Sequence, residues 1–280
     1  MQRVRNGVTP CAMRHGLPVR LRACLAASAL LIACGDRDRD ANAAARIDTA
    51  AVESSRIAAD SAFADSVLRA SEDIGASVTE TASNNPAPTR DPIATHNMLV
   101  AYAAETYIGE LFAAHDSTNF RWPEHTRDPL RVWIQPSTLD GYTAAHLMAV
   151  RDAFDPWVAT GIPVAFDFTE DSARAEILVT WVARYESRTT GRTRTVRDQH
   201  GWITGAGIEL ALAQPDGRVL DDASLRAIAR HEIGHLLGLD HTADESNIMA
   251  ARVRVTELSE ADHATVRLVY KLPPGKLRSP

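Results

Sequence analysis

Two histidines and a glutamate lie together in one short stretch of the chain, His231-Glu232-Ile233-Gly234-His235. Histidines four residues apart project from the same face of a helix, one turn from each other. Two neutral imidazoles on one face are the beginning of a zinc site, because zinc accepts histidine nitrogens readily. Glu232 follows the first histidine, where its carboxylate can take a proton from water at the metal without binding the metal. These residue types at this spacing indicate metal-assisted hydrolysis.

A third histidine, His241, follows six residues after His235. A continuing helix would carry it away from the other two, but Gly238 can adopt a positive φ and end the helix. The chain then turns back, and His241 can close on the same metal. Three protein ligands leave a fourth position open for water, which is typical of a catalytic zinc site. We therefore predict three ligands for one Zn²⁺ and assign Glu232 as the catalytic base; the alternative is a buried helix whose polar residues bind nothing.

The elements that must position these residues follow from hydrophobic periodicity. The site itself is predicted to lie on a helix over residues 221–239, with Asp221 or Asp222 as its N-cap. Three further helices are predicted, at residues 98–114, 143–160 and 259–270, the last with a capping box. Strands are predicted at residues 130–135, 163–168 and 176–182, with a hairpin of 192–196 and 203–213 across 198–201. Strands come first and the two clearest helices last, which predicts an α+β (α/β-type) layered fold.

Asn247-Ile248-Met249-Ala250 come shortly after the third histidine, with Met249 eight residues beyond it. Together with the extended histidine pattern, this segment resembles the metzincin zinc metalloproteases, and among them the matrixins. The resemblance covers residues 121–272. It implies the metzincin fold, a twisted mixed sheet with a zinc-binding active-site helix, a Met-turn and a C-terminal helix. It also implies supporting roles for Gly238, which ends the helix, and for Met249, which forms an apolar floor under the metal.

The implied activity is that of a zinc metalloendopeptidase, which hydrolyses peptide bonds of extended protein substrates by metal-activated water. One catalytic Zn²⁺ is implied; a structural calcium ion is compatible with the resemblance, and no sequence pattern points to its ligands. Substrate is expected along an edge strand within residues 191–206. The chain departs from the family in carrying Thr242 where Ser is usual. His200 is the only histidine between residues 181 and 230, so a second zinc site built from several histidines is not expected. No cysteine lies between residues 34 and 280, so inhibition by a prodomain cysteine that ligates the zinc is not expected either.

Two other functions compete with this interpretation. One is a non-catalytic surface lipoprotein that uses the metzincin fold to bind a partner. The presence of Glu232 speaks against it, since a binding module does not need a general base. The other is a zinc-dependent amidase acting on the cell wall.

The N-terminal segment has the pattern of an export signal. Residues 1–33 contain five arginines and no acidic residue, and they end in eleven uncharged residues, too few for a membrane span of roughly 20. Leu31-Ile32-Ala33-Cys34 resembles the bacterial lipobox, which implies a lipid on Cys34 that anchors a secreted protein in the cell envelope, at the outer membrane or cell surface. The alternative is an ordinary signal peptide with an incidental cysteine.

The domain boundaries, the net charge and the expected partners follow from composition together with the N-terminal pattern. We expect a lipoprotein signal peptide at residues 1–33, a low-complexity tether or stalk at 34–90, with an exposed helix as the alternative, and a protease domain at 91–275. The chain of 280 residues carries a formal charge of −6, and without residues 1–33 it carries 25 basic and 36 acidic residues, or −11. This acidity argues against nucleic acid as a partner. The expected partners are a peptide or protein substrate and the membrane, with the protein itself a monomer.

Overall fold

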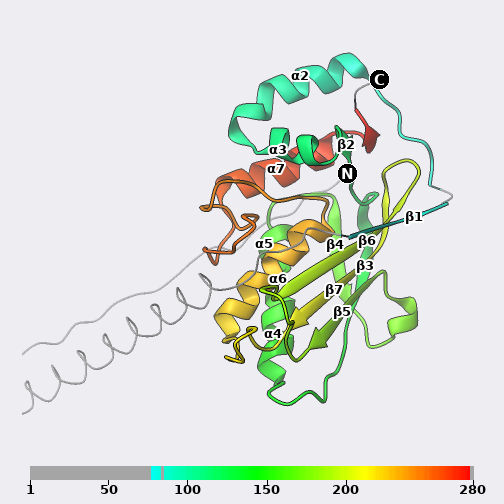
Figure 1. Cartoon of the computed structure of the whole chain (residues 1–280). Coiled ribbons are helices and arrows are strands. Elements are labelled where there is room, and N and C mark those ends of the chain that lie inside the picture. The colour runs from blue at the N-terminus through cyan, green and yellow to red at the C-terminus, as the bar shows by residue number, and fades with distance from the viewer. Residues whose placement is uncertain (1–76, 83–84, 278–280) are drawn as a thin grey trace, which may run out of the picture. The chain divides into compact units, whose positions relative to one another are not determined.

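A six-stranded sheet forms the centre of the molecule (Figure 1), which is described by a computed structural model for residues 77–82 and 85–277. The strand order across the sheet is β1-β6-β7-β5-β3-β4. These strands are β1 (Ser77–Thr81), β3 (His125–Ile134), β4 (Val164–Phe168), β5 (Ile177–Val182), β6 (Gly191–Asp198) and β7 (Ile203–Ala211). A second, two-stranded sheet pairs β2 (Thr118–Asn119) with β8 (Gly275–Lys276).

The main sheet is mixed, as predicted. β3 runs parallel to β4 and β5, and β5 runs parallel to β7. β6 is antiparallel to β7, so these two strands form the predicted hairpin. β1 adds to the outer side of β6 in parallel, with Ser77 opposite Arg194 and Thr81 opposite Asp198. β1 therefore lies ahead of residue 91, where we placed the start of the protease domain.

Three helices form a group around α6: α4 (Ala144–Asp152), α5 (Asp155–Val158) and α6 (Asp222–Leu236) itself. α6 contacts β6, β7 and α4. The predicted single helix over 143–160 is wrong, because α4 ends at Asp152 and a separate short turn begins at Asp155. Pro156 in that turn has no N–H to donate, so it cannot continue an α-helical ladder from α4.

The remaining helices form a group of their own, in which α3 packs on α7 (Figure 1). They are α2 (Pro92–Tyr102), the 3₁₀ turn η1 (Ala103–Glu105), α3 (Ile108–Ala114) and α7 (Glu260–Lys271); a second 3₁₀ turn, η2, spans Ser172–Arg174. The predicted single helix over 98–114 is therefore also wrong. The Thr106 hydroxyl donates to the carbonyl of Tyr102, and the next residue, Tyr107, enters the core, which separates α2 from α3.

The core lies between the sheet and the helices. Leu130, Val132 and Ile134 alternate inward along β3, and the large side chains Trp122 and Trp157 are fully buried. α7 begins at the predicted capping box, in which Ser259 and Asp262 satisfy each other's backbone N–H groups. The predicted signal peptide, the lipobox with Cys34 and most of the predicted tether lie outside the described residues. Within the described part of the chain, no helix is long and apolar enough to cross a membrane.

Candidate metal centre and active site

Helix α6 carries the predicted site through the interior of the molecule. Asp221 caps its first turn by accepting from the Ser224 N–H at 2.7 Å. From residue 227 to its end at Leu236, every residue of α6 is buried. Two tryptophans hold this buried part from outside the helix. The Trp157 Nε1–H donates to the Arg230 carbonyl and the Trp122 Nε1–H donates to the Leu236 carbonyl, both at 2.9 Å.

The end of α6 requires glycine for two separate reasons. Gly238 has a φ of 98°, a left-handed conformation that side chains disfavour. A Cβ at this position would also overlap the carbonyl oxygen of Phe120, a backbone atom that cannot move aside as a side chain can. The chain therefore leaves the helix at this residue and turns back, and this turn brings His241 to the two histidines of α6.

The three histidines converge. The Nε2 atoms of His231 and His235 are 3.2 Å apart, and those of His235 and His241 are also 3.2 Å apart. The ligating atoms of all three residues lie within 4.8 Å of one another. The structure thus brings together the three residues predicted as metal ligands, two from one helix face and one from the loop after it.

The surroundings of these histidines fit a zinc ion. His231 Nδ1 lies 2.7 Å from the Ile248 carbonyl oxygen, and His235 Nδ1 lies 3.0 Å from the Leu239 carbonyl oxygen. A carbonyl can only accept, so each Nδ1 carries the proton and each Nε2 presents its lone pair to the common centre. Catalytic zinc sites use three protein ligands and leave the fourth position to water, and three imidazole nitrogens are one such donor set.

Glu232 lies on α6 beside the first ligand, and only 1% of its surface is exposed. Its carboxylate points toward β6, where the Thr193 hydroxyl donates to Oε2 at 2.7 Å. Glu232 is thus a buried carboxylate held next to the edge of the sheet and next to the histidine cluster. This position is compatible with the predicted role of a base that serves the metal centre without binding the metal.

Met249 is fully buried under the histidine-bearing turn of α6. A Cβ on Gly234 would overlap the Met249 sulfur atom, so the glycine between the two helical histidines allows this close packing. The Met249 carbonyl accepts from the Thr242 N–H at 3.0 Å, which ties the segment to the residue after His241. Met249, the predicted supporting residue, therefore packs against α6 between the two helical histidines and holds the loop that carries the third ligand.

The turn around Met249 is anchored by one buried carboxylate. Asp262 on α7 accepts from the Ile248 N–H at 2.9 Å, and Ile248 is the residue whose carbonyl lies against His231. The Tyr107 hydroxyl donates to the other oxygen of Asp262 at 3.0 Å. Burial, and then the charge of Asp262, raise the pKa of Tyr107 well above its ordinary value, so the hydroxyl remains a donor.

Two further acidic residues hold the loop that carries His241. Glu110 on α3 accepts from the Ala243 N–H at 2.7 Å. Asp240 accepts from the His241 N–H at 2.7 Å, and its other oxygen lies 3.0 Å from His115 Nε2. Burial raises the pKa of Asp240, but the bonds from His115 and from the His241 backbone outweigh it, and the pKa falls far below its ordinary value.

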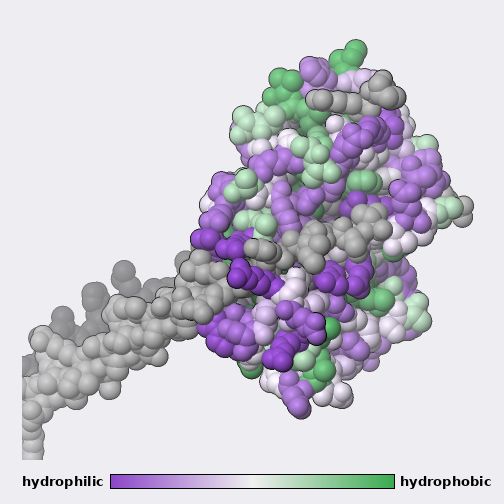
Figure 2. Space-filling view, viewed as in Figure 1, coloured by the Kyte–Doolittle hydropathy of each residue, from purple (hydrophilic) through white to green (hydrophobic). Residues whose placement is uncertain are grey.

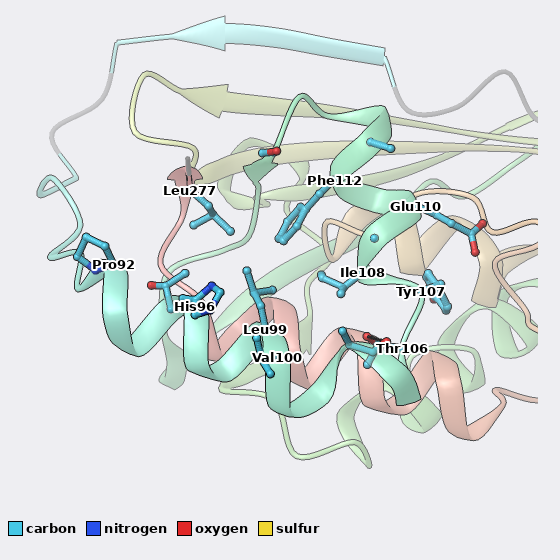
Figure 3. A pocket seen from close by; sticks show the side chains of 15 residues that line it. Pro92, His96, Leu99, Val100, Thr106, Tyr107, Ile108, Glu110, Phe112 and Leu277 are labelled. Atoms are coloured by element: carbon cyan, nitrogen blue, oxygen red, sulfur yellow. Dashed lines mark hydrogen bonds between the residues drawn. The ribbon is translucent and has the colours of Figure 1, made fainter. Parts of the chain in front are cut away.

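A cavity of about 720 Å³ lies elsewhere, between α2 and α3 (Figure 3). Leu99, Ile108 and Phe112 contribute to its apolar lining, and neither Glu232 nor any of the three histidines lines it. Hydrophobic surface also gathers over α2 (Figure 2), where Ile93 and Val100 are strongly exposed. This cavity is therefore a feature of the N-terminal helices and separate from the metal centre.

Several residues that shape the site were not predicted from the sequence. They are Gly191, Thr193, Tyr107, Glu110 and Asp262 in its role at the Met-turn. Each acts on a residue 14 or more positions away, or sits on an element whose neighbours the local pattern does not reveal. Gly234, which also shapes the site, had a local signal, since an isolated glycine inside a strong helix pattern indicates a packing constraint.

The comparisons with known proteins agree with this geometry. A family model described as Matrixin (Peptidase_M10) matches residues 121–271, which is more than half of the chain. Metalloendoproteinase 1-MMP of Arabidopsis thaliana is 28% identical over 171 residues, covering 56% of this chain and 46% of the relative. Metalloendoproteinase 5-MMP of the same plant is 28% identical over 171 residues, covering 54% and 45%.

The chain spans less than half the length of these curated relatives. The match nevertheless begins just before β3 and ends at the last residue of α7, so it includes α6, the loop of His241 and the Met-turn. Zinc is the metal of this family, and the three converging histidines lie inside the matched region. The chain belongs to the matrixin family of metalloproteases.

Proposed function

We propose that this chain is a zinc-dependent endopeptidase that hydrolyses peptide bonds of extended protein substrates. The observation that carries the proposal is the convergence of the His231, His235 and His241 Nε2 atoms, with the buried carboxylate of Glu232 on the same helix. Zinc bound by these histidines would supply Lewis-acid chemistry, which acidifies water and polarises a carbonyl group.

Glu232 moves the protons in this proposal. Its carboxylate takes a proton from the attacking water and then delivers that proton to the nitrogen of the leaving amine. The two transfers leave the carboxylate unchanged at the end of each cycle. Burial serves this role, since a carboxylate shielded from bulk water and held by the Thr193 hydroxyl keeps its position between the two transfers.

The outer edge of β6 is the proposed binding surface for the substrate. An extended peptide can add to a free sheet edge as one more strand. Among the residues that the structure describes, β1 pairs with residues 194–198 of β6, and no strand pairs with residues 191–193 on that side. Thr193 contacts Glu232, so this stretch of edge lies next to the proposed base. Peptide bound here would present its backbone beside the metal centre.

A Glu232→Ala variant of the full chain tests the proposal. Wild type, loaded with zinc, is expected to cleave a denatured protein mixture, and cleavage should stop with a chelator and fall by roughly 10²-fold or more in the variant. Cleavage sites would be determined by mass spectrometry. Glu170→Ala, which removes an exposed glutamate, is the matched control and should cleave like wild type.

Three results would each contradict the proposal. Equal cleavage by wild type and by Glu232→Ala would exclude Glu232 as the base. Release of peptides from purified peptidoglycan without cleavage of proteins would favour the cell-wall amidase. A zinc-loaded chain that binds proteins and cleaves neither substrate would favour the non-catalytic surface lipoprotein.

We also propose that the chain is a secreted, monomeric lipoprotein of a bacterial cell envelope, anchored through Cys34. The support is the short apolar run before Leu31-Ile32-Ala33-Cys34, and the division into residues 1–33, 34–90 and 91–275 is part of the same proposal. Expression in a bacterium fed an alkyne-tagged fatty acid should label the wild-type chain. Cys34→Ser should abolish the label, while Cys24→Ser should keep it; label retained by Cys34→Ser would refute the anchor.

A further inference from the structure

Two positions of β6 shape the space that the Glu232 carboxylate occupies. The Thr193 Oγ1–H donates to Glu232 Oε2 at 2.7 Å, and the same hydroxyl lies 3.0 Å from the Glu232 carbonyl oxygen. Thr193 and Glu232 are both buried, with exposures of 0% and 1%. A hydrogen bond to an ionised group is roughly twice as strong as one between neutral groups, and burial keeps competing water away from it.

Gly191 closes the other side of the same space. A Cβ on Gly191 would overlap Glu232 Oε1 and crowd the Cδ and Cγ atoms of that side chain. Gly191 has no positive φ, so its backbone conformation does not require glycine. Thr193 and Gly191 are two residues apart on a strand and therefore face the same side, toward α6. Thr193 supplies a hydrogen-bond donor to the Glu232 carboxylate, and Gly191 leaves space for it.

This arrangement treats the two carboxylate oxygens differently. Oε2 receives the hydrogen bond from Thr193, which restricts rotation of the carboxylate about its Cγ–Cδ bond. Oε1 lies against Gly191, where no side chain displaces it. A group that must accept a proton at one point and return it at another depends on its geometry, and a misplacement of about 1 Å can cost 10²-fold in rate.

We propose that Thr193 and Gly191 are positioning residues for Glu232: the Thr193 hydroxyl holds Oε2, and Gly191 leaves Oε1 in place for proton transfer. The inference rests on the proposed protease function and adds to it residues from the substrate-binding strand itself. It makes β6 serve two purposes, since its outer edge is the proposed substrate surface and its inner face orients the base.

The chain contains a matched control. Thr195 is two residues further along β6, faces the same side and is 1% exposed. Its Oγ1 has no hydrogen-bond partner in the part of the chain that the structure describes, and its main chain is already flanked by β1 and β7. A change from Thr to Val at 195 therefore alters the same atoms as at 193 without removing a contact to Glu232.

The test compares Thr193→Val, Thr193→Ser and Thr195→Val in the full, zinc-loaded chain. Thr193→Val should lower kcat by about tenfold or more with KM within about twofold of wild type. Thr193→Ser retains the hydroxyl and should recover most of the activity, and Thr195→Val should behave like wild type. Gly191→Ala should lower kcat at least as much as Thr193→Val, because its methyl group displaces the carboxylate.

Two measurements besides activity accompany the assay. Zinc affinity, measured by competition with a chromogenic chelator, and the midpoint of thermal unfolding should change little in Thr193→Val. Crystal structures of wild type and Thr193→Val should show the Glu232 carboxylate in different orientations. Unchanged kcat in Thr193→Val, or an unchanged carboxylate, would overturn the inference; so would parallel losses of zinc affinity and stability in Thr193→Val and Thr193→Ser.

Failure of the inference and failure of the proposed function give different results. If wild type binds zinc and cleaves nothing, the proposed function fails, and the crystal structures still decide whether Thr193 and Gly191 hold the carboxylate. If wild type cleaves and Thr193→Val cleaves equally well, the function stands and the positioning role is refuted.

Discussion

At the scale of single residues, the site depends on glycines that the structure needs for different reasons. Gly238 combines a positive φ with a backbone neighbour too close for any side chain. Gly234 lies inside α6 with ordinary helical geometry, and glycine is needed there for space, chiefly for Met249 and also for the ring of Trp157. The histidine spacing and the helix-ending role of Gly238 could be predicted because they are local. The contact of Gly234 with Met249, 15 residues away, could not.

The role of Gly234 leads to a prediction that opposes helix propensity. Alanine at an interior helix position is favoured over glycine by about 1 kcal/mol. Gly234→Ala should nevertheless lower the free energy of unfolding by about 1–3 kcal/mol, because the methyl group would meet the buried Met249 sulfur and force it to move. Denaturant unfolding of the chain would measure the change.

Gly109→Ala is the control for this substitution. Gly109 lies in α3, and a Cβ there would meet nothing within 4 Å, so alanine should stabilise the chain by about 0.5–1 kcal/mol. If both substitutions stabilise the chain equally, Gly234 is not required for packing against Met249.

At the scale of elements, the strongest periodic signals gave the right structure. α6, α7 and the β6–β7 hairpin agree with their predicted positions to within a few residues. The two long predicted helices are each divided in the structure, because Tyr107 turns into the core to reach Asp262 and because Pro156 interrupts the ladder after α4. A periodic pattern alone does not reveal either break.

β1 could not have been predicted by the same reasoning. Its five residues, Ser77 to Thr81, include one apolar side chain, and its partner strand begins 110 residues later. Its importance comes from where it pairs, since it covers residues 194–198 of the edge that we propose for substrate. Within the described residues, the part of that edge without a strand partner is therefore shorter than β6 itself.

Disrupting β1 should lengthen the free edge. Proline cannot donate to a ladder, and in a parallel pair alternate residues bond the partner, so Val78→Pro and Thr79→Pro should be made separately. At least one of them should lower KM for a protein substrate by about threefold or more with kcat unchanged, because five more residues of β6 become available. Steady-state kinetics in the full chain would measure this.

Ala82→Pro, one residue beyond the end of β1, is the control and should leave KM at the wild-type value. An unchanged KM in both strand variants would mean that β1 does not compete with substrate for β6.

At the scale of the whole molecule, a continuous series of contacts joins the metal centre to the N-terminal helices. His231 lies against the Ile248 carbonyl, the Ile248 N–H donates to Asp262, and Asp262 accepts from Tyr107. A parallel contact runs from Glu110 to the loop after His241. Tyr107 and Glu110 both precede residue 121, where the family match begins.

Removal of the Tyr107 hydroxyl, at the end of this series of contacts, should lower the stability of the chain. Tyr107→Phe leaves a buried Asp262 oxygen without its donor, so the free energy of unfolding should fall by about 1–3 kcal/mol. Addition of zinc should raise the unfolding midpoint of wild type and variant alike, since binding to the folded state stabilises both. Calorimetry with and without chelator would measure both effects.

Tyr102→Phe provides the comparison, because Tyr102 is 41% exposed and contacts Lys271 through its ring. This variant should unfold at the wild-type midpoint. If Tyr107→Phe does the same, the hydroxyl of Tyr107 contributes nothing to the Asp262 anchor.

The contacts of Tyr107 and Glu110 also mean that cuts at two different places in the chain would have different consequences. Cleavage at the start of the family match would release α2 and α3, and with them the donor to Asp262 and the acceptor for the Ala243 N–H. The turn behind His231 and the loop of His241 would each lose an anchor. Cleavage between β1 and Pro92 would instead separate β1 from the rest of the chain, so that it could leave the outer side of β6, and both anchors would stay intact. The position of a single cut thus decides whether the chain loses the strand beside β6 or the two anchors next to His231 and His241.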